Sequence, residues 1–167
     1  METVAVYWED RIKTYGFSET AGLAFLQWTA FPEELRVLGK GMENPGEAGT
    51  GMLLVLGQGS VDRTVAFGLL VDQRWEERMT RRLRGLLSER SRDSVSGLSP
   101  AGLIHFYGPH FGDRYGIADA GLRVLTGREI PILAIACSAS SIYLVLSETR
   151  MEEAKNALAE VFVRPGD

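Results

Sequence analysis

A glycine-rich segment at residues 108–117 contains the groups best suited to bind a small anion. It reads Gly-Pro-His-Phe-Gly-Asp-Arg-Tyr-Gly-Ile and precedes a predicted helix. The first backbone N–H groups of a helix have no intrahelical acceptor and carry partial positive charge, so they attract anions such as carboxylates. Gly112 and Gly116 would let the backbone approach a ligand closely. Asp113 either caps the helix or accepts a hydrogen bond from a cationic group of the ligand.

A second group of small polar side chains lies between two apolar runs at 132–136 and 142–146. These hydroxyl and thiol groups either contact the side chain of a bound ligand or form an ordinary turn between strands, and the residues alone leave both interpretations open. Neither role needs an ionised nucleophile. The candidate ligand-binding residues of the two segments together are His110, Phe111, Gly112, Asp113, Arg114, Tyr115, Gly116, Ile117, Cys137, Ser138, Ser140 and Ser141.

His105, His110 and Cys137 are the histidines and the cysteine of the chain, and they raise the question of a metal site or a Cys–His nucleophile. Their spacing matches no common zinc pattern, and no orienting acid accompanies them. We therefore predict no catalytic residue, no metal site and no cofactor. His105 is expected to be a structural histidine within a strand, and Cys137 a small buried side chain.

The composition excludes several classes of partner. The 167 residues carry a net charge of −4 with a pI of about 5.3, which favours neither nucleic acid nor an anionic membrane. Arg74, Arg78 and Arg81 are interleaved with Glu76 and Glu77, a pattern typical of a solvated helix face. No apolar run approaches the roughly 20 residues of a membrane span, and the start does not resemble a signal peptide. A single cysteine fits a reducing compartment, so we expect a cytoplasmic location.

The hydrophobic pattern predicts two α/β units joined by a linker at residues 88–100, a stretch rich in serine and arginine. The first unit is expected to contain strands at 3–8, 12–17 and 22–30, a helix at 32–39, a loop at 40–51, a hairpin with strands 52–56 and 64–71, and a helix at 73–90. The second is expected to contain a strand at 103–107, a helix at 115–125, strands at 132–136 and 142–146, and a helix at 150–162.

From residue 22 and from residue 103 the predicted elements follow the same order, βαββα. This repeat predicts an α+β fold of two ferredoxin-like βαββαβ sandwiches, each an antiparallel sheet with helices on one face. The corresponding domains are residues 1–92 and 93–167.

Residues 100–163 resemble an ACT domain of the aspartokinase regulatory type. The loop at 108–118 is similar to the ACT loop before the first helix. The run Ile-Pro-Ile-Leu-Ala-Ile-Ala-Cys-Ser-Ala-Ser-Ser-Ile at 130–142 is similar to the second and third strands of that family. The predicted helix at 151–162 completes the pattern. The resemblance implies a regulatory module rather than an enzyme.

The segment Val-Tyr-Trp-Glu-Asp-Arg-Ile-Lys at residues 6–13 resembles the beginning of aspartokinase regulatory pairs. In that family the first strand crosses over to complete the sheet of the second repeat. The resemblance therefore implies a tandem ACT pair in which residues 3–8 pair with the second sheet.

The family implies an effector that is an amino acid or a similar small zwitterion, bound at an interface between ACT domains. Its carboxylate is expected against residues 111–116, beside the strand carrying residues 137–141 of an adjoining domain. The first unit is expected to bind none, because Pro32, Glu33 and Glu34 stand at its helix start. The resemblance also implies a homo-oligomer, a dimer in the simplest case, and a protein partner that receives the signal.

Two other functions compete with this one. The first is a structural dimerisation module with no ligand. The second is an enzyme on a ferredoxin-like fold, which would need convergent acid, base or metal-binding groups that the sequence does not show.

Overall fold

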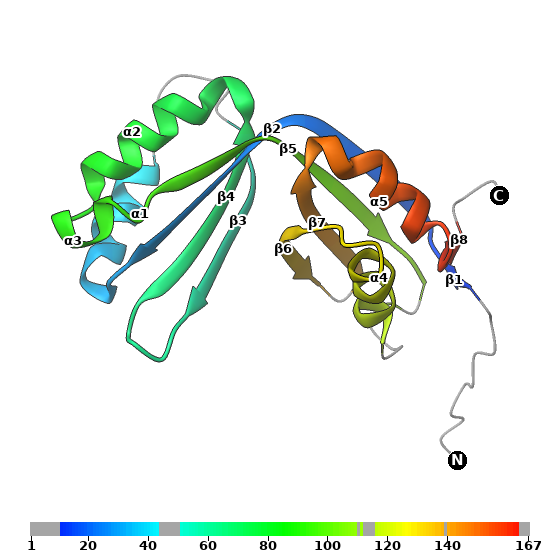
Figure 1. Cartoon of the computed structure of the whole chain (residues 1–167). Coiled ribbons are helices and arrows are strands. Elements are labelled where there is room, and N and C mark those ends of the chain that lie inside the picture. Colours follow the sequence, from blue (N-terminus) through cyan, green and yellow to red (C-terminus); the bar gives the residue numbers. More distant parts are fainter. Residues whose placement is uncertain (1–10, 44–50, 110, 112–115, 139, 164–167) are drawn as a thin grey trace, which may run out of the picture.

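The computed structural model describes residues 11–43, 51–109, 111, 116–138 and 140–163. Two long strands, β2 (Gly16–Ala30) and β5 (Ser96–Tyr107), run through the centre of the molecule (Figure 1). The shorter strands are β3 (Met52–Gly59), β4 (Val65–Asp72), β6 (Ile132–Cys137) and β7 (Ser141–Ser147). In the described residues they form one sheet of order β3-β4-β2-β5-β7-β6, and β1 (Ile12–Lys13) pairs in parallel with β8 (Phe162–Val163).

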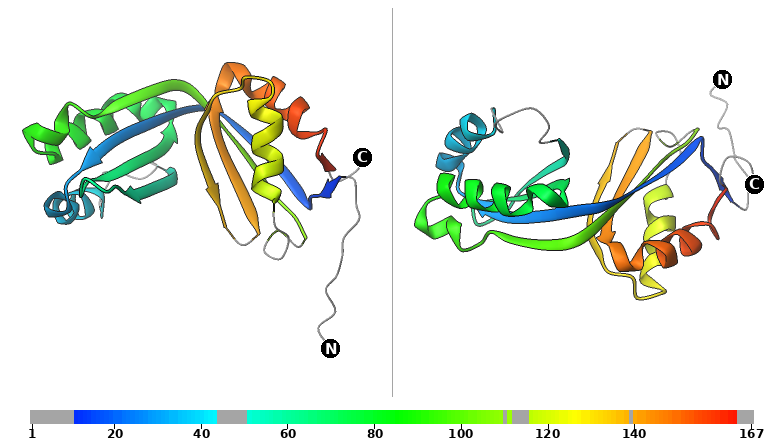
Figure 2. Two further views of the ribbon diagram at one scale, coloured as in Figure 1. Left: turned by 60° about the horizontal axis from the view of Figure 1, so that its bottom comes forward. Right: turned by 90° about the horizontal axis from the view of Figure 1, so that it is seen from above.

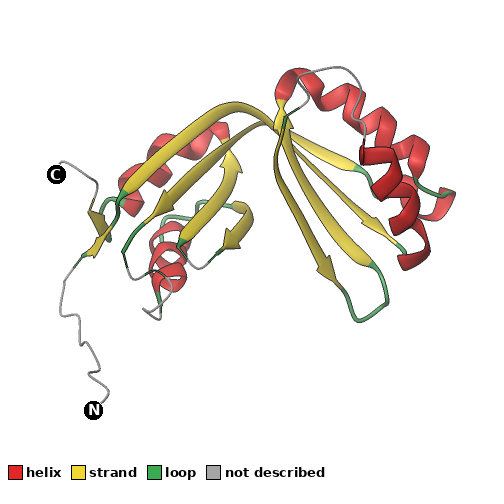
Figure 3. Ribbon diagram, turned by 180° about the vertical axis from the view of Figure 1, so that it is seen from behind, coloured by secondary structure: helices red, strands yellow, loops and turns green. Residues whose placement is uncertain are grey.

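The helices lie on the outer sides of two half-sheets that diverge from the crossing of β2 and β5 (Figures 1 and 3). The first half carries the 3₁₀ turn η1 (Pro32–Glu34), α1 (Leu35–Glu43), η2 (Gln73–Trp75), α2 (Glu76–Leu86) and α3 (Glu89–Arg92). The second carries α4 (Ile117–Thr126), η3 (Glu148–Arg150) and α5 (Met151–Leu158). No helix in the described part of the chain is long and apolar enough to cross a membrane.

Each long strand is hydrogen-bonded to neighbours in both half-sheets. Residues 16–20 of β2 pair with the end of β5 in the second half, whereas residues 96–98 at the start of β5 pair with β2 in the first half. Between these regions the register shifts at residues 20–23, where Gly22 has a φ of 69° that favours glycine. The side chain of Glu148 accepts a hydrogen bond from the Gly22 N–H at 2.7 Å, so η3 holds this bulge.

Three apolar clusters form the core. One lies between the second half-sheet and α4 and α5 and includes Phe106 and Phe162; another lies under α1 and α2 and includes Trp28 and Met79. A third, which includes Phe25, fills the junction of the two half-sheets on their helix-free side. Figure 2 shows the halves from two further directions, joined by the long strands. The two layers that face outward are therefore helical, and the apolar inner faces meet at the junction.

The predicted fold class is confirmed, since both halves follow the order βαββα in an antiparallel sheet with helices on one face. Several element boundaries were wrong. Residues 12–17 and 22–30 do not form two separate strands, because the bulge at Gly22 lets β2 continue from residue 16 to residue 30. The helix predicted to end at 39 continues to Glu43, into the predicted loop.

The prediction of a linker at residues 88–100 was also wrong. It contains α3 and the first residues of β5, which pair with residues 25–27 of β2. Val95 is buried, and the Ser94 hydroxyl accepts a hydrogen bond from the Thr29 N–H at 3.0 Å. The helix predicted to reach residue 90 ends at Leu86, because Leu87 adopts an extended backbone. The polar composition of this segment was misleading, because its residues pair and form hydrogen bonds with β2.

Residues 3–8 lie outside the described residues. In the second half, the place beside the end of β5 is occupied by residues 16–20 of β2. A division of the chain into domains 1–92 and 93–167 remains a proposal; β2 belongs to the first range and β5 to the second, and each of them pairs in both half-sheets.

Candidate functional site

A cavity of about 220 Å³ lies at the N-terminal end of α4. One wall comes from the segment before α4 and from its first turn, and the other from the facing ends of β6 and β7. The residues that line it are Phe111, Gly116, Ile117, Ala118, Cys137, Ser138 and Ile142. The structure therefore brings together the two segments that the sequence singled out, within one half of the molecule.

Gly116 forms the N-cap of α4 in a left-handed conformation, with a φ of 85°. No side chain in the described residues caps this helix, and a Cβ atom built on Gly116 would meet nothing within 4 Å. No described residue therefore crowds the Cβ position of Gly116, and the first N–H groups of α4 lack intrahelical acceptors. Backbone N–H groups at a helix start can bind an anion, and anion binding by Gly116 and Ile117 stays a prediction.

The opposite wall is a tight turn between β6 and β7. The Ser138 N–H donates to the carbonyl of Ser141 at 2.9 Å, and the Gly108 N–H donates to the carbonyl of Ser140 at 3.4 Å. A strand-end turn therefore joins β6 and β7, and a ligand contact by the residues of this turn that line the cavity stays a prediction. Cys137 and Ser138 line the cavity, whereas Ser140 and Ser141 do not. The turn and the end of β5 are held together, which fixes this wall in place.

Phe111 connects the cavity to the core of the second half. Its ring contacts Phe106 edge-on at a centroid distance of 6.0 Å and also contacts Phe162 at 6.5 Å. A Cβ atom at Gly108 would lie 2.6 Å from the carbonyl oxygen of Lys13 and 2.5 Å from the Phe111 ring, so glycine is required there. The wall formed by Phe111 thus depends on close packing around residue 108.

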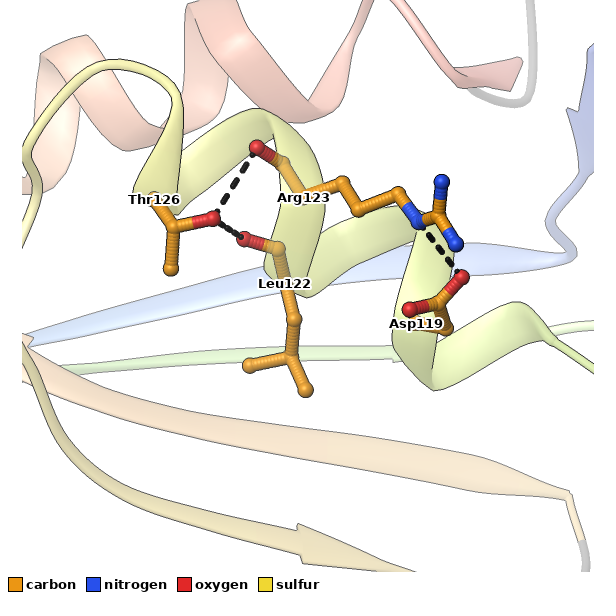
Figure 4. A network of polar contacts seen from close by, with 4 residues as sticks. All are labelled: Asp119, Leu122, Arg123 and Thr126. Carbon is orange, nitrogen blue, oxygen red and sulfur yellow. Dashed lines mark hydrogen bonds and ion pairs between the residues drawn. The ribbon is translucent and has the colours of Figure 1, made fainter.

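The exposed side of α4 carries its own polar contacts (Figure 4). Asp119 accepts from Arg123 Nε at 2.7 Å, and the Thr126 hydroxyl donates to the carbonyls of Leu122 and Arg123. The Asp119–Arg123 pair is solvent-exposed, so it stabilises the fold by less than about 1 kcal/mol. Because Arg123 binds it, Asp119 is not a free acceptor in the first turn of α4.

His105 is a structural histidine, as predicted. Its ring stacks on Tyr143 at a centroid distance of 4.4 Å and on Tyr107 at 5.8 Å, and its Nδ1 lies 3.3 Å from the Ser18 hydroxyl. Burial lowers the pKa of His105, so the ring is neutral at physiological pH. The aromatic contacts account for the placement of this residue.

Cys137 is exposed at the mouth of the cavity, so the prediction of a buried thiol is wrong. It ends an edge strand, and only β7 covers β6 on one side. Desolvation by the cavity wall raises the pKa of the thiol, which therefore remains protonated at neutral pH. Within the described residues no cluster of three His, Cys, Asp or Glu residues is arranged to hold a metal ion.

His110, Gly112, Asp113, Arg114 and Tyr115 are candidate residues that lie outside the described residues. Two further cavity residues, Ala118 and Ile142, were missed by sequence reasoning. Ala118 belongs to the first turn of α4, and Ile142 opens the run of apolar residues in β7. The helical register after Gly116 was the signal that could have identified Ala118.

A larger cleft of about 490 Å³ separates the two half-sheets and is bordered by both free sheet edges, β3 and β6. The side chains that line it are uncharged, with Gln27 and Gln58 as polar groups and Leu133 and Ile135 among the apolar ones. It contains no helix N-terminus. A zwitterion requires groups that compensate both of its charges, so the cavity at α4 is the better candidate site.

The chain matches no family model, and no curated protein matches it. Among solved structures it is similar to the ligand-free regulatory subunit of aspartate kinase from Thermus thermophilus, with a TM-score of 0.74 and 13% identity over 90% of this chain and 99% of that one. It is also similar to a chain of the aspartokinase alpha and beta subunits (TM-score 0.72, 18% identity, 88% and 97% coverage). A third match is aspartate kinase from Clostridium acetobutylicum, with a TM-score of 0.71 and 13% identity over 90% of this chain and 35% of that one.

These similarities show that the chain has the ACT-type fold of aspartate kinase regulatory domains. At such low identities the similarity extends to the backbone architecture alone.

Proposed function

We propose that this protein is a non-catalytic regulatory module that binds an amino acid, or a similar small zwitterion, in the cavity at the start of α4. The observation that carries the proposal is the convergence of two segments: the helix start at Gly116, which no side chain of the described residues caps, and the turn that follows Cys137. The ACT-type fold, found in regulatory subunits of aspartate kinase, supports a regulatory role.

Each part of the cavity suits one part of such a ligand. The N–H groups at Gly116 and Ile117 suit a carboxylate. Phe111, Ile117 and Ile142 provide an apolar wall for a small side chain, and the Ser138 hydroxyl provides a polar group at the rim. The cavity volume of about 220 Å³ is of the scale of a single amino acid. Asp113 is a further candidate for the ligand ammonium group.

The adjoining domain expected at this site is not needed to form the cavity, because both walls belong to the second half. We therefore place the ligand within that half. A partner molecule would act by closing the cavity mouth, where Cys137 and Ser138 are exposed. A ligand that binds one arrangement of the partners better than another shifts the population toward it, which is the basis of the regulatory effect.

The proposal predicts that a small amino acid raises the melting temperature of the protein. A ligand at 100 times its dissociation constant adds about 2.7 kcal/mol of stability, which corresponds to a rise of roughly 5–10 °C for a chain of this size. The measurement is a thermal shift screen of the common amino acids, followed by calorimetry of each hit. We expect one bound ligand per chain. Two equivalent ligands per chain would show that the site is misplaced.

If no amino acid changes the melting temperature, the structural dimerisation module becomes the better description. The free edges of the sheet support this alternative. β3 contains no charged residue, and Met52, Leu53 and Val55 are exposed apolar residues along it. Natural edge strands usually carry charges or prolines that prevent pairing, so an uncharged edge indicates a covering partner. We propose that this partner is a second copy of the chain.

Replacing Val55 by lysine is expected to convert the homodimer into a monomer. The Val55 side chain is 54% exposed on the edge strand, and a charge there would be buried unpaired on dimerisation. A matched control is Val61→Lys, since Val61 is fully exposed in the turn between β3 and β4 rather than along the strand. Light scattering at micromolar concentration measures both variants. A wild-type monomer, or a dimer of Val55→Lys as stable as that of Val61→Lys, would contradict this interface.

A further inference from the structure

The two half-sheets are joined at a narrow crossing. In the described residues, β2 and β5 are the strands that pair in both half-sheets. Their mutual register shifts twice at the crossing, between Thr20 and Leu23 and between Leu23 and Phe25. Gly22 lies in the first of these irregularities with a φ of 69°. Because bulges interrupt the ladder of hydrogen bonds and bend the strand, backbone pairing alone does not set the angle between the half-sheets.

The helical segment formed by η3 and α5 holds β2 at this interruption. The Glu148 carboxylate accepts a hydrogen bond from the Gly22 N–H at 2.7 Å. Lys155 Nζ lies 3.0 Å from the carboxylate of Glu19, which directly precedes the first register shift. The Lys155 side chain is 18% exposed, so water screens this ion pair less than it screens a surface pair. Two side chains of one helical segment therefore fasten the irregular part of β2.

The same segment is packed against β5. A Cβ atom at Gly102 would overlap the thioether of Met151, so the Met151 side chain occupies the space over this glycine. Met151 is buried and belongs to the apolar core of the second half. Ala101, the neighbour of Gly102, pairs with Leu23 of β2 at the crossing. The segment therefore contacts both long strands where they pass from one half-sheet to the other.

The inner side of the crossing leaves room for the half-sheets to move. Side chains from both halves, among them Leu70 and Val145, meet in the third apolar cluster. Next to this cluster, the cleft of about 490 Å³ separates Leu56 and Gln58 of the first half from Leu133 of the second. A change of angle would widen or narrow this cleft without forcing its walls into contact. The contacts of η3 and α5 on the outer side are therefore suited to fix the angle.

We propose that η3 and α5 form a clamp that sets the angle between the two half-sheets, so that the second half controls the orientation of the first. The clamp also touches the helix at the candidate site. A Cβ atom at Gly121 of α4 would lie 3.6 Å from the Leu158 side chain of α5, so the two helices approach closely. A displacement of α4 by a ligand would therefore reach the clamp. This last step rests on the proposed function, whereas the clamp itself stands on the contacts of Glu148, Met151 and Lys155.

The test is a distance between labels on the two halves. Cys137 is the single cysteine of the chain and is exposed at the end of β6. A Val61→Cys variant adds a second thiol in the turn between β3 and β4, where Val61 is fully exposed. The end of β6 and this turn lie on different half-sheets (Figure 1). Both thiols of this parent protein carry nitroxide spin labels, and pulsed electron spin resonance gives the distribution of their separation. An excess of unlabelled protein removes distances between copies.

Removing the clamp contacts is expected to change this distribution. In Glu148→Ala combined with Lys155→Met, the mean distance is expected to shift by about 3 Å or more, the rise of one strand residue, because the bulge can then move along β2. The distribution should also broaden. The matched control is Glu153→Ala, since Glu153 lies in the same helical segment and pairs with Arg150 of that segment at 2.8 Å. This control is expected to keep the distribution of the parent protein.

A distribution that the double substitution leaves unchanged would overturn the proposal, and so would an equal change in Glu153→Ala. Circular dichroism checks that each variant is folded. If the double variant is unfolded, the same comparison is made with Glu148→Ala and with Lys155→Met as single substitutions.

The outcome for the clamp is independent of any ligand. A shift in the double variant without an amino-acid hit in the thermal screen would uphold the clamp and remove the proposed function. A hit together with an unchanged distance in the double variant would uphold the proposed function and remove the clamp. Each stabilising amino acid of the screen is then added to the labelled parent protein and is expected to change the distance there but not in the double variant. A distance that the amino acid leaves unchanged in the parent protein would remove the step through α4.

Discussion

Replacement of Phe106 by alanine is expected to lower the free energy of unfolding by about 3–5 kcal/mol, a large part of the stability of a typical domain. Phe106 is fully buried in β5 at the centre of the second half. Its ring stacks on Phe17 at 5.4 Å and contacts Phe162 at 4.7 Å and Phe111 at 6.0 Å. Alanine would leave a cavity among three aromatic rings that belong to three different segments. Urea denaturation monitored by circular dichroism measures the change.

The matched control is Tyr107→Ala, one residue further along the same strand, where the side chain is 41% exposed. Because this side chain is partly in water, its removal is expected to cost about 1 kcal/mol. Phe106→Ala should also weaken ligand binding, since Phe111 loses the ring that it packs against. If the two variants lose equal stability, the aromatic cluster does not anchor the second half.

Replacement of Gly116 by valine is expected to weaken ligand binding by more than about 100-fold, which corresponds to about 2.7 kcal/mol. The valine side chain would project into the open space at the start of α4, where the ligand carboxylate is proposed to lie. The φ of 85° is also unfavourable for a β-branched residue, at a cost of about 1–2 kcal/mol to the fold. The binding effect should therefore exceed the stability effect.

Calorimetry with the amino acid found in the screen measures this prediction, and circular dichroism confirms that the variant is folded. Glu33→Ala is the control, because Glu33 is exposed in the first half and should leave affinity unchanged. Normal affinity in Gly116→Val would mean that the ligand binds elsewhere, with the cleft between β3 and β6 as the next candidate.

Much of the fold could be predicted from local sequence patterns. The apolar stripe of α2 and the continuous apolar runs of β4 and β7 are local patterns, and such patterns depend little on the rest of the chain. The repeated order βαββα then restricts the architecture to a few arrangements. Part of the candidate site could also be predicted from a local pattern. A turn that leads into a helix favours glycine, and Gly116 stands at such a turn with a positive φ.

Only the tertiary structure decided which distant segments are joined. The bulge at Gly22 lets β2 pair in both half-sheets, and residues 96–100, which contain two serines, a glycine and a proline, become part of β5 because β2 offers an unpaired edge. Glu34 reads as an exposed acid in a first helical turn, yet it is buried because Ser88 and Ser91 approach from α3. Hydrophobic periodicity contains no information about these partners, since hydrogen bonds between residues more than 50 positions apart depend on how the folded chain brings them together.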